Sequence, residues 1–594
     1  MTFLSLLTAY RAQFGCDDET PLLKLIVPRR TGFAARSNAF RDRLWNFQSC
    51  LSFIDRTEFS QRYEAPKADM PLAVVLNLSV CMLLVCRTRV KQQNCDVASL
   101  GQMIAKELQY PWLLDHAPLP KTLVMFNGRK NTEAAKPILE TAYDLGIRLV
   151  ILDHPGHWLI KSPYNHLYHE FIPMDMNFDD DLPHRIVAAV QTCLPVDGLF
   201  TVSDPCLVAV AQAALILGLP TEPPAAFAAS VDKSQTRAFS AAPAIEDGDD
   251  GFQFASAASL AELDGLLTSS QFIPRYPLIV KPSTGWSSEN VFKIHNRTEL
   301  LQAAAGIPSR PASPRILVET YVNGPEVDAN FVLLDGRVLF FEASDDFPCA
   351  ADAVDAGFKA DFGEQANLLP STLPPQELNS IHDTLLHILR AVGFRTGVFH
   401  LEARVRDSTM AYTTTEDGVL DLDRKRAGCL DAPRCFLIEI NARPPGFQSL
   451  YATRVAYGID YVALHLLAAL GDHPRMQALS HATRQMSPFQ EETATGQYPL
   501  WCQILFIASH DRQGGICETP DACETLLEVH PHLSSHVVMG KSFFRSGDYV
   551  PPLSANSRVF LAFFLVVSRT SRVEVLKVGE EIRKYFRLDL QRQT

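Results

Sequence analysis

A short run of residues around position 440 combines side chains that could hold a metal ion and a phosphate group. Alternation along the predicted strand 436–441 places Glu439 and Asn441 on one face, with Arg443 just beyond them on the same side. Carboxylate and amide oxygens side by side suit a hard cation such as Mg²⁺. A guanidinium next to them suits a phosphate or a carboxylate. The plain alternative is an edge strand whose polar side chains are solvated.

A second predicted strand, 397–404, repeats the pattern. Alternation there puts His400, Glu402 and Arg404 on one face, among apolar neighbours on the other. Two such strands can bring Glu402 and Glu439 together, which is costly without a counter-ion and natural around Mg²⁺. His400 by itself is more typical of a packed histidine than of a metal ligand.

Two upstream segments could meet a nucleotide. The strand 277–282 contains Lys281 and runs into the small-residue loop 283–290, whose backbone N–H groups could wrap phosphates. The Walker pattern is absent, and a simple hairpin turn is an equal alternative. Glu319 ends a later apolar strand and Glu326 follows seven residues on, so this linker is a candidate hinge for adenine and ribose. Solvated glutamates are the common alternative.

The elements that must position these residues follow from periodicity. From residue 121 short apolar strands alternate with helices, which predicts a parallel sheet covered by helices, a doubly wound α/β domain. The turn Asp335-Gly336 predicts a hairpin of strands 327–334 and 337–342. Beyond about residue 480, further strands and a last amphipathic helix predict an α+β segment. The strands expected in these two parts are 122–126, 148–152, 198–202, 500–508 and 559–567, and the helices are 132–145, 205–217 and 573–585. A further helix is expected between the two parts, over residues 460–470.

Composition sets outer limits on the class of protein. The 594 residues are 47% hydrophobic and 20% charged, as in an ordinary globular protein of several domains. The net charge of −13 argues against general nucleic-acid or anionic-membrane binding, because both need a basic face. Thirteen cysteines without a CxxC pair indicate reduced, mostly buried thiols. The apolar run 71–86 is too short to span a bilayer, and no signal peptide is evident, so a cytoplasmic location is expected.

One resemblance gathers the candidate residues. Taken in order with the segments 278–291, 318–328, 397–405 and 438–446, the candidates resemble the ATP-grasp superfamily: Lys233, Lys281, Glu319, Glu326, Glu402, Glu439, Asn441 and Arg443. The segments 202–220 and 343–348 resemble its carnosine-synthase and L-amino-acid ligase branch in particular. The resemblance covers roughly residues 120–475, and the set in this order is much more specific than any single member.

The resemblance implies a fold and a division of the chain. It implies an α/β and α+β multidomain protein, with a doubly wound pre-ATP-grasp domain followed by the ATP-grasp fold. The expected parts are an N-terminal region of unknown role (1–118), the pre-ATP-grasp domain (119–230), the ATP-grasp domain (231–480) and a C-terminal α+β domain (481–594).

It also implies roles, residue by residue. Arg443 and Lys281 would be catalytic, and Glu402, Glu439 and Asn441 would bind Mg²⁺, which Mn²⁺ can replace. The residues expected to bind ATP are Lys233, Lys281, Ser287, Ser288, Glu319, Tyr321, Val322 and Glu326. The loop with Ser287 and Ser288 departs from glycine-rich relatives, because it has a single glycine. By position only, Trp286, His400, Asp345 and Asp346 are expected on the substrate side.

The implied activity is an ATP-dependent carboxylate–amine ligase that joins amino acids or similar small molecules through an acyl phosphate. We expect the enzyme to act in a specialised metabolite pathway, as a monomer or a homodimer. Three alternatives remain: another ATP-grasp chemistry such as carboxylation of biotin, a catalytically silent nucleotide-binding module, and a metal hydrolase. The hydrolase would use a polar cluster that follows a predicted strand, Asp153, His154, His157, His166 and His169. That cluster lacks the HExxH spacing of metalloproteases.

Overall fold

The protein is described from a computed structural model. It describes residues 11, 21–44, 47, 51–67, 70–92, 96–108, 110–193, 195–240, 252–285, 288–307, 315–353, 355–358, 360–425, 432–482, 500–509, 511, 513–553 and 559–592. Two of the residues predicted from the sequence, Trp286 and Ser287, lie outside these ranges.

The predicted doubly wound domain is confirmed as a parallel sheet with the order β10-β7-β8-β9. Its strands are β7 (Thr122–Phe126), β8 (Arg148–Asp153), β9 (Glu170–Pro173) and β10 (Gly198–Phe200), and its helices include α6 (Thr132–Asp144), α7 (Leu182–Gln191) and α8 (Leu207–Leu217). Asn131 caps α6 by accepting from Ala134 N, and Gly218 ends α8 in the left-handed conformation. The helix predicted over residues 205–217 begins only at Leu207, because residues 204–206 form a 3₁₀ turn.

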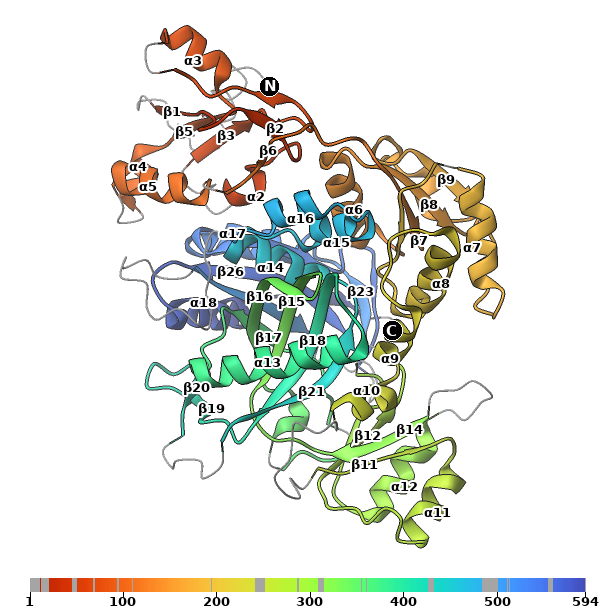
Figure 1. Ribbon diagram of the computed structural model, residues 1–594. Coiled ribbons are helices and arrows are strands. Elements are labelled where there is room, and N and C mark those ends of the chain that lie inside the picture. Colours follow the sequence, from red (N-terminus) through yellow and green to blue (C-terminus); the bar gives the residue numbers. More distant parts are fainter. Residues whose placement is uncertain are drawn as a thin grey trace.

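A small antiparallel sheet, ordered β11-β14-β12-β13, forms a lobe at the lower end of Figure 1. Its elements are β11 (Phe254–Ala257), β12 (Leu278–Pro282), β13 (Phe292–Ile294), β14 (Ile316–Thr320), α11 (Leu260–Thr268) and α12 (Arg297–Gly306). The short helix α10 (Lys233–Ser240) lies between this lobe and the rest of the molecule (Figure 1). The loop 283–290 therefore joins two antiparallel strands, β12 and β13, as a hairpin connection does.

An eight-stranded antiparallel sheet forms the centre of the molecule, in the order β21-β18-β15-β16-β17-β22-β26-β24. The strands are β15 (Glu326–Leu334), β16 (Arg337–Asp346), β17 (Ala366–Leu369), β18 (Gly397–Arg406), β21 (Arg434–Asn441), β22 (Trp501–Ala508), β24 (Val537–Ser542) and β26 (Phe560–Ser568). The predicted hairpin is confirmed, with Asp335 and Gly336 at φ 51° and 75° in its turn. The C-terminal segment has the expected α+β content. Its strands β22, β24 and β26 continue the central sheet, and β23 (Gly515–Cys517), β25 (Tyr549–Val550) and β27 (Leu590–Gln591) form a small sheet of their own.

Helices cover the central sheet on both faces (Figure 1). They include α13 (Pro375–Val392), α14 (Phe447–Tyr457), α15 (Tyr461–Ala469), α16 (His473–Leu479) and α18 (Arg572–Tyr585). Between β18 and β21, β19 (Met410–Thr414) and β20 (Leu420–Arg424) pair as a hairpin. The interruption at residues 415–419 supplies its turn.

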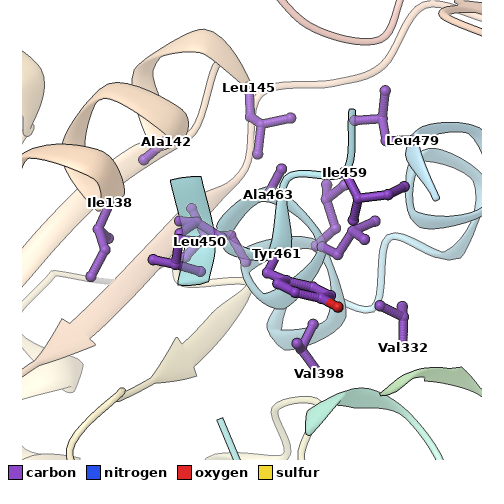
Figure 2. Close-up of a cluster of buried hydrophobic side chains, with 14 of the residues drawn as sticks. Ile138, Ala142, Leu145, Val332, Val398, Leu450, Ile459, Tyr461, Ala463 and Leu479 are labelled. Carbon is purple, nitrogen blue, oxygen red and sulfur yellow. The ribbon is translucent and has the colours of Figure 1, made fainter. Parts of the chain in front are cut away.

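A buried apolar cluster fixes the parallel-sheet domain against the central sheet (Figure 2). Ile138 of α6 and Leu145, the C-cap of α6, lie on one side of α15, and Val332 and Val398 of the central sheet lie on the other. Tyr461 of α15 is fully buried between them. Because α15 is held on both sides, the strand ends of the parallel sheet keep a fixed position relative to the strand ends of the central sheet.

The N-terminal region contains two small sheets, ordered β1-β5-β3 and β4-β2-β6. The strands are β1 (Leu22–Ile26), β2 (Gly32–Ala34), β3 (Leu51–Asp55), β4 (Arg62–Tyr63), β5 (Cys81–Val85) and β6 (Leu113–Leu114), with helices α2 (Arg41–Leu44), α3 (Leu72–Leu78), α4 (Arg87–Gln92) and α5 (Val97–Glu107). The apolar run 71–86 becomes α3 and β5. No helix among the described residues is long and apolar enough to cross a membrane. The nine described cysteines are all free, as the sequence predicts.

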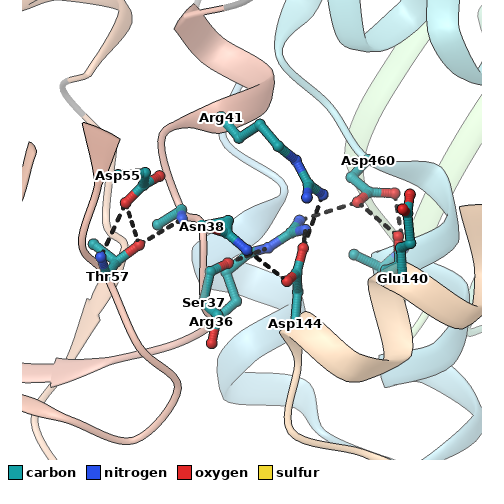
Figure 3. Close-up of polar contacts among 12 residues, drawn as sticks. Arg36, Ser37, Asn38, Arg41, Asp55, Thr57, Glu140, Asp144 and Asp460 are labelled. Carbon is teal, nitrogen blue, oxygen red and sulfur yellow. Dashed lines mark hydrogen bonds and ion pairs between the residues drawn. The ribbon is translucent and has the colours of Figure 1, made fainter. Parts of the chain in front are cut away.

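Buried ion pairs attach this region to the rest of the chain (Figure 3). Arg36 Nη1 lies 3.0 Å from Asp460 Oδ2 at the start of α15. Arg36 and Arg41 both contact Asp144 at the end of α6, and Asn38 Nδ2 donates to the same carboxylate at 2.8 Å. The N-terminal region is therefore joined to the two helices that set the relative position of the two larger sheets.

Candidate active site

One face of the central sheet carries a layer of polar side chains, because residues two apart in a strand share a face. On β15 this layer consists of Glu326, Asp328 and Asn330. The strand register sets Asp328 opposite Glu402, and Glu402 opposite Glu439 on the next strand. The predicted pairing of Glu402 with Glu439 is therefore present. Asp328 and Asn330 escaped the sequence reasoning, although both follow Glu326 at the strand period of two.

The predicted metal ligands lie together at one end of this layer. His400 and Glu402 lie opposite Asn441 and Glu439, respectively. Burial raises the pKa of the Glu402 carboxyl to about 8, and the nearby carboxylates of Glu439 and Glu326 add to this effect. Carboxylate and amide oxygens are hard donors, so Glu402, Glu439 and Asn441 fit Mg²⁺, and a divalent ion would relieve the repulsion between the two carboxylates.

A second grouping shares Glu402. One potential ligand atom from each of Asp328, His400 and Glu402 lies within 4.8 Å of the others. His400 Nδ1 and Asn330 Oδ1 are 3.0 Å apart, and burial lowers the pKa of His400 to about 3, so its ring is neutral at pH 7. Asp328 is buried and its pKa is well above the ordinary value, first because of burial and then because of neighbouring carboxylates. Asp328 thus adds a carboxylate beside the predicted ligands.

Lys233 reaches the same place from α10. Its Nζ lies 2.8 Å from Glu439 Oε2, and its backbone N–H donates to the carbonyl of Ser283 at 2.8 Å. Ser283 opens the loop after β12, which carries the predicted phosphate contacts. The start of α10 is thus bonded to that loop. Ser288, the described member of the predicted serine pair, has a positive φ of 54° in the loop.

Lys281 and Glu319 form a buried ion pair across β12 and β14, with Lys281 Nζ 2.6 Å from Glu319 Oε1. Arg237 of α10 completes the cluster by donating to both Glu319 oxygens, at 2.6 and 3.2 Å. Burial alone would raise the pKa of Glu319, but Arg237 and Lys281 outweigh it and lower the pKa to about 2. Burial lowers the pKa of Lys281. The Glu319 carboxylate is therefore fully engaged by cations, so its predicted role at the adenine edge would fall to the neighbouring backbone.

Arg237 was not among the predicted residues. Its Nη1 and Nη2 also donate to the carbonyls of Leu437 and Ile438, at 2.6 and 3.1 Å. It therefore joins the small lobe, through Glu319, to the strand that carries the metal ligands. The available signal was its position one helical turn after Lys233, which puts both cations on one side of α10.

Arg404 organises the predicted hinge. Its Nε donates to Glu326 Oε2 at 2.8 Å, and its Nη2 lies 2.7 Å from Asp352 Oδ1. The Tyr321 hydroxyl donates to the same Asp352 oxygen at 2.9 Å, and the carbonyl of Val322 accepts from Arg404 Nη1 at 3.3 Å. Glu326, Tyr321 and Val322, all predicted to meet ATP, are thus held by one arginine.

Arg443 extends the site toward the parallel-sheet domain. Its Nε and Nη2 contact the carboxylate of Asp204 at 2.8 Å each, and Nη2 also donates to Asn441 Oδ1 at 3.0 Å. Asp204 follows β10, at the start of the 3₁₀ turn that precedes α8. The guanidinium therefore bridges a predicted metal ligand and a residue of the other sheet.

The two aspartates predicted on the substrate side, Asp345 and Asp346, lie on opposite faces of the central sheet. Asp346 lies in the polar layer, where Asn367 Nδ2 donates to it at 2.9 Å. Asp345 points to the other face, is fully buried, and pairs with Arg572 Nη1 of α18 at 2.9 Å. The expectation for Asp345 is wrong, because consecutive residues of a strand face opposite sides.

The cluster that suggested a metal hydrolase has a structural explanation. Asp153 accepts from the backbone N–H of Gly128 at 2.7 Å, and His157 Nε2 bonds to the carbonyl of Arg129 at 2.9 Å. His166 bonds to the carbonyl of Pro163. Among the described residues, the one group of three potential ligands close enough for a metal ion is that of Asp328, His400 and Glu402.

Comparison with known proteins agrees with this geometry. The ATP-grasp N-terminal domain model matches residues 139–221, and the ATP-grasp domain model matches residues 274–414. The ATP-grasp enzyme fsqD of Aspergillus fumigatus is 30% identical over 581 residues, which are 95% of this chain and 97% of fsqD. The chain therefore belongs to the ATP-grasp family of enzymes, as the resemblance in its sequence indicates.

More distant relatives match parts of the chain. Carnosine synthase 1 of Gallus gallus is 25% identical over 368 residues. The aligned part is 59% of this chain and 35% of carnosine synthase 1. Among solved structures, an L-amino acid ligase from Bacillus licheniformis has a TM-score of 0.57 and 21% identity. The match covers 80% of this chain and 99% of the ligase chain. A phosphoribosylglycinamide synthetase from Anaerococcus prevotii has a TM-score of 0.52 and 15% identity. The match covers 80% of this chain and 100% of the synthetase chain. These two structures show a shared fold.

Proposed function

We propose that the protein is an ATP-dependent ligase that joins a carboxylate to an amine, forming an amide or peptide bond and releasing ADP and phosphate. The substrates are amino acids or related small molecules, and the activated intermediate is an acyl phosphate. The observation that supports this most is the opposed pair Glu402 and Glu439 within a buried polar layer. Lys233 of α10 contacts Glu439, and Arg443, just beyond β21, contacts Asn441. Lys281 of β12 pairs with Glu319.

Different groups of residues would contact different parts of the ATP molecule. Tyr321, Val322 and Glu326, held by Arg404, would contact the adenosine part, and Lys233, Lys281, Ser287 and Ser288 would contact the phosphates. Bound at Glu402, Glu439 and Asn441, Mg²⁺ or Mn²⁺ would neutralise charge on the phosphates. Charge neutralisation and alignment are the main requirements of phosphoryl transfer.

Transfer of the γ-phosphoryl group to the substrate carboxylate gives ADP and the acyl phosphate. Arg443 would hold that group as phosphate leaves and the amine nitrogen bonds to the carbonyl carbon. The amine loses a proton in this step, and the oxygen shared with the carboxylate departs with phosphate. The loop between β12 and β13 would cover the acyl phosphate and exclude water, which would otherwise hydrolyse it.

The substrate class is supported by the relatives. The chain is similar in sequence to carnosine synthase 1 and in fold to an L-amino acid ligase, and we extend to this chain the amino-acid substrates that the second name states. The alignment with fsqD extends over 95% of the chain, so it includes most of the N-terminal region. We extend the proposal to a cytoplasmic enzyme of a specialised metabolite pathway that works on small molecules, as a monomer or homodimer.

A second ATP-grasp chemistry, carboxylation, is the competing candidate. A biotin carboxylase from Campylobacter jejuni has a TM-score of 0.50 and 14% identity, which reflects the fold alone. ATP turnover that depends on bicarbonate and is stimulated by biotin would favour it over the ligase.

The decisive experiment identifies the nucleotide product and traces an oxygen atom from the substrate carboxylate. The purified chain is incubated with ATP, Mg²⁺ and pairs of amino acids, and the nucleotide products are separated. The proposal requires ADP, and transfer of ¹⁸O from a labelled substrate carboxylate into phosphate. Formation of AMP with pyrophosphate would overturn the acyl-phosphate route, and ADP release that needs no carboxylate would overturn the ligase. Glu416→Gln, in an exposed turn, serves as the matched control for active-site glutamate variants.

A further inference from the structure

The group of Asp328, His400 and Glu402 combines two carboxylates with an imidazole, which distinguishes it from the all-oxygen set predicted for Mg²⁺. The three residues lie on two neighbouring strands. Asp328 of β15 is opposite Glu402 of β18, and His400 shares the face of Glu402. One ligand atom from each residue lies within 4.8 Å of the others. The group therefore meets the distance condition for holding a metal ion of its own.

Hydrogen bonds fix which nitrogen of the His400 ring carries the proton. Glu342 Oε1 accepts from Asn330 Nδ2 at 2.9 Å. Two hydroxyls donate to the same oxygen, that of Thr453 at 3.1 Å and that of Tyr461 at 3.0 Å. These contacts turn the nitrogen of the Asn330 amide toward Glu342 and leave its Oδ1 for His400. Because Oδ1 only accepts, His400 Nδ1, 3.0 Å away, is the nitrogen that carries the proton.

His400 Nε2 is therefore left with a lone pair. It lies 3.8 Å from Glu402 Oε1, beyond hydrogen-bond distance, and it forms no hydrogen bond within the described residues. Histidines that bind metals typically donate one ring N–H to an oxygen acceptor and present the other nitrogen to the ion. An ion that holds its ligands at about 2.1 Å spaces them roughly 3.4 Å apart in a tetrahedral site. Small side-chain movements would bring Nε2 and Oε1 to that spacing.

The charge around this group is negative. Asp328 is buried, and no lysine or arginine in the described ranges forms an ion pair with Asp328 or Glu402. The nearby cations each contact a carboxylate outside the group: Lys233 with Glu439, Arg404 with Glu326 and Arg443 with Asp204. Two carboxylates beside a bare imidazole nitrogen thus lack a cation of their own, and a divalent ion would supply it.

An ion can enter the group from the side of Glu402. The Glu402 side chain is 34% exposed, whereas that of His400 is only 10% exposed. Glu402 also belongs to the set predicted for Mg²⁺, together with Glu439 and Asn441. Its carboxylate has two oxygen atoms and can bridge two ions, as carboxylates in two-metal sites do. Occupation of one site therefore does not exclude the other.

We propose that Asp328, Glu402 and His400 Nε2 form a second metal site, which takes a first-row transition ion such as Mn²⁺, Fe²⁺ or Zn²⁺ in preference to Mg²⁺. Imidazole is a good ligand for transition ions, whereas Mg²⁺ prefers oxygen ligands and loses its water reluctantly. The site would bind its ion without ATP or substrates, so it does not depend on the proposed ligase function.

Mn²⁺ is the probe, because its unpaired electrons report a nitrogen ligand and because thiolates favour softer ions. The purified chain is stripped of metal with a chelator, and less than one equivalent of Mn²⁺ is added without nucleotide. Pulsed electron paramagnetic resonance should show coupling of Mn²⁺ to a ¹⁴N nucleus. The coupling should persist in about a tenfold excess of Mg²⁺, since Mg²⁺ competes poorly for a site with a nitrogen ligand.

His400→Gln should abolish the nitrogen coupling and raise the Kd for Mn²⁺ at least about tenfold. Asp328→Asn should raise the Kd by a similar factor and keep the coupling, because the imidazole remains. His116→Gln, at an exposed position, is the matched control and should change neither.

Wild-type protein that binds Mn²⁺ through oxygen ligands alone, or binds none, would overturn the inference, and this result does not depend on any variant folding. A nitrogen coupling that is unchanged in His400→Gln would also overturn it. Both results would leave the ligase proposal intact, because ADP release tests that proposal separately.

Discussion

Glu402 of β18 lies directly opposite Glu439 of β21, and a register shift follows immediately after Glu402. Lys233 Nζ approaches this pair from α10 and lies 2.8 Å from Glu439. One lysine for two carboxylates leaves the pair short of positive charge, which is the condition that a divalent cation would relieve.

The first prediction concerns this pair. Glu439→Gln should lower the rate of ADP release by about 100-fold or more, because it removes a charged metal ligand and the partner of Lys233. It should also raise the concentration of Mg²⁺ needed for half-maximal activity. ADP release is measured across a Mg²⁺ titration, after removal of metal with a chelator, for the wild type, this variant and Glu416→Gln. An unchanged Mg²⁺ dependence would contradict the placement of Glu439 at the metal.

The second prediction concerns the buried cluster of Arg237, Lys281 and Glu319. Glu319→Gln should lower the free energy of unfolding by about 3–5 kcal/mol, because it leaves two buried cations without their carboxylate. Urea unfolding followed by tryptophan fluorescence measures the change. Glu299→Gln, at a half-buried position in the first turn of α12, keeps an oxygen that can accept from the backbone N–H of His295 and should cost less than about 1 kcal/mol. A similar loss in both variants would contradict a special role for the cluster.

Local patterns were sufficient to predict much of the site. The strand period of two is a property of neighbouring residues, so Glu402 and Glu439 could be placed on matching faces without knowledge of the fold. The doubly wound domain was predictable for the same reason, since each strand and helix carries its own periodicity and capping residues. The same period separates Asp345 from Asp346, and closer attention to it would have removed Asp345 from the site.

Contacts between distant segments could not be predicted in this way. Arg237 reaches Glu319 and the carbonyls of β21 because α10 packs between two sheets, and nothing near Arg237 in the sequence specifies that packing. The continuation of the central sheet through β22, β26 and β24 depends on strand order, which arises from non-local pairing. The link between Arg443 and Asp204 likewise needs the position of the parallel sheet relative to β21.

The third prediction concerns nucleotide binding at the hinge. Glu326→Gln should raise the KM for ATP roughly tenfold and leave kcat within about twofold, since it weakens a contact to the ribose and not one to the transferred phosphoryl group. The wild type should prefer ATP to 2′-deoxy-ATP, and the variant should lose that preference if Glu326 bonds to the ribose. Arg404→Lys keeps the charge but loses the fork that holds Glu326 and Asp352, so a smaller rise in KM is expected. A loss of kcat without a change in KM would contradict the assignment of Glu326 to the nucleotide.

The last prediction concerns pH and the attachment of the N-terminal region. Asp460 Oδ1 lies 2.7 Å from Arg454 Nη2, and Asp460 Oδ2 lies 3.0 Å from Arg36 Nη1. Burial would raise the pKa of Asp460, but Arg454 and Arg36 outweigh it and hold the pKa well below the ordinary value of 3.8. The stability that the ionised carboxylate contributes is therefore fully present above the unfolded pKa of about 3.9, and is lost as pH falls through the folded pKa.

Asp460→Asn isolates that charge, because asparagine caps a helix as well as aspartate does and α15 keeps its N-cap. The variant should be less stable than the wild type by about 3–5 kcal/mol at pH 7, and the difference should shrink as pH falls from about 5 toward 2. Urea unfolding at a series of pH values measures it. Asp115→Asn, which removes an exposed partner of Arg30, should change stability by less than about 1 kcal/mol at every pH. A difference for Asp460→Asn that stays constant down to pH 2 would show that the buried charge does not stabilise this junction.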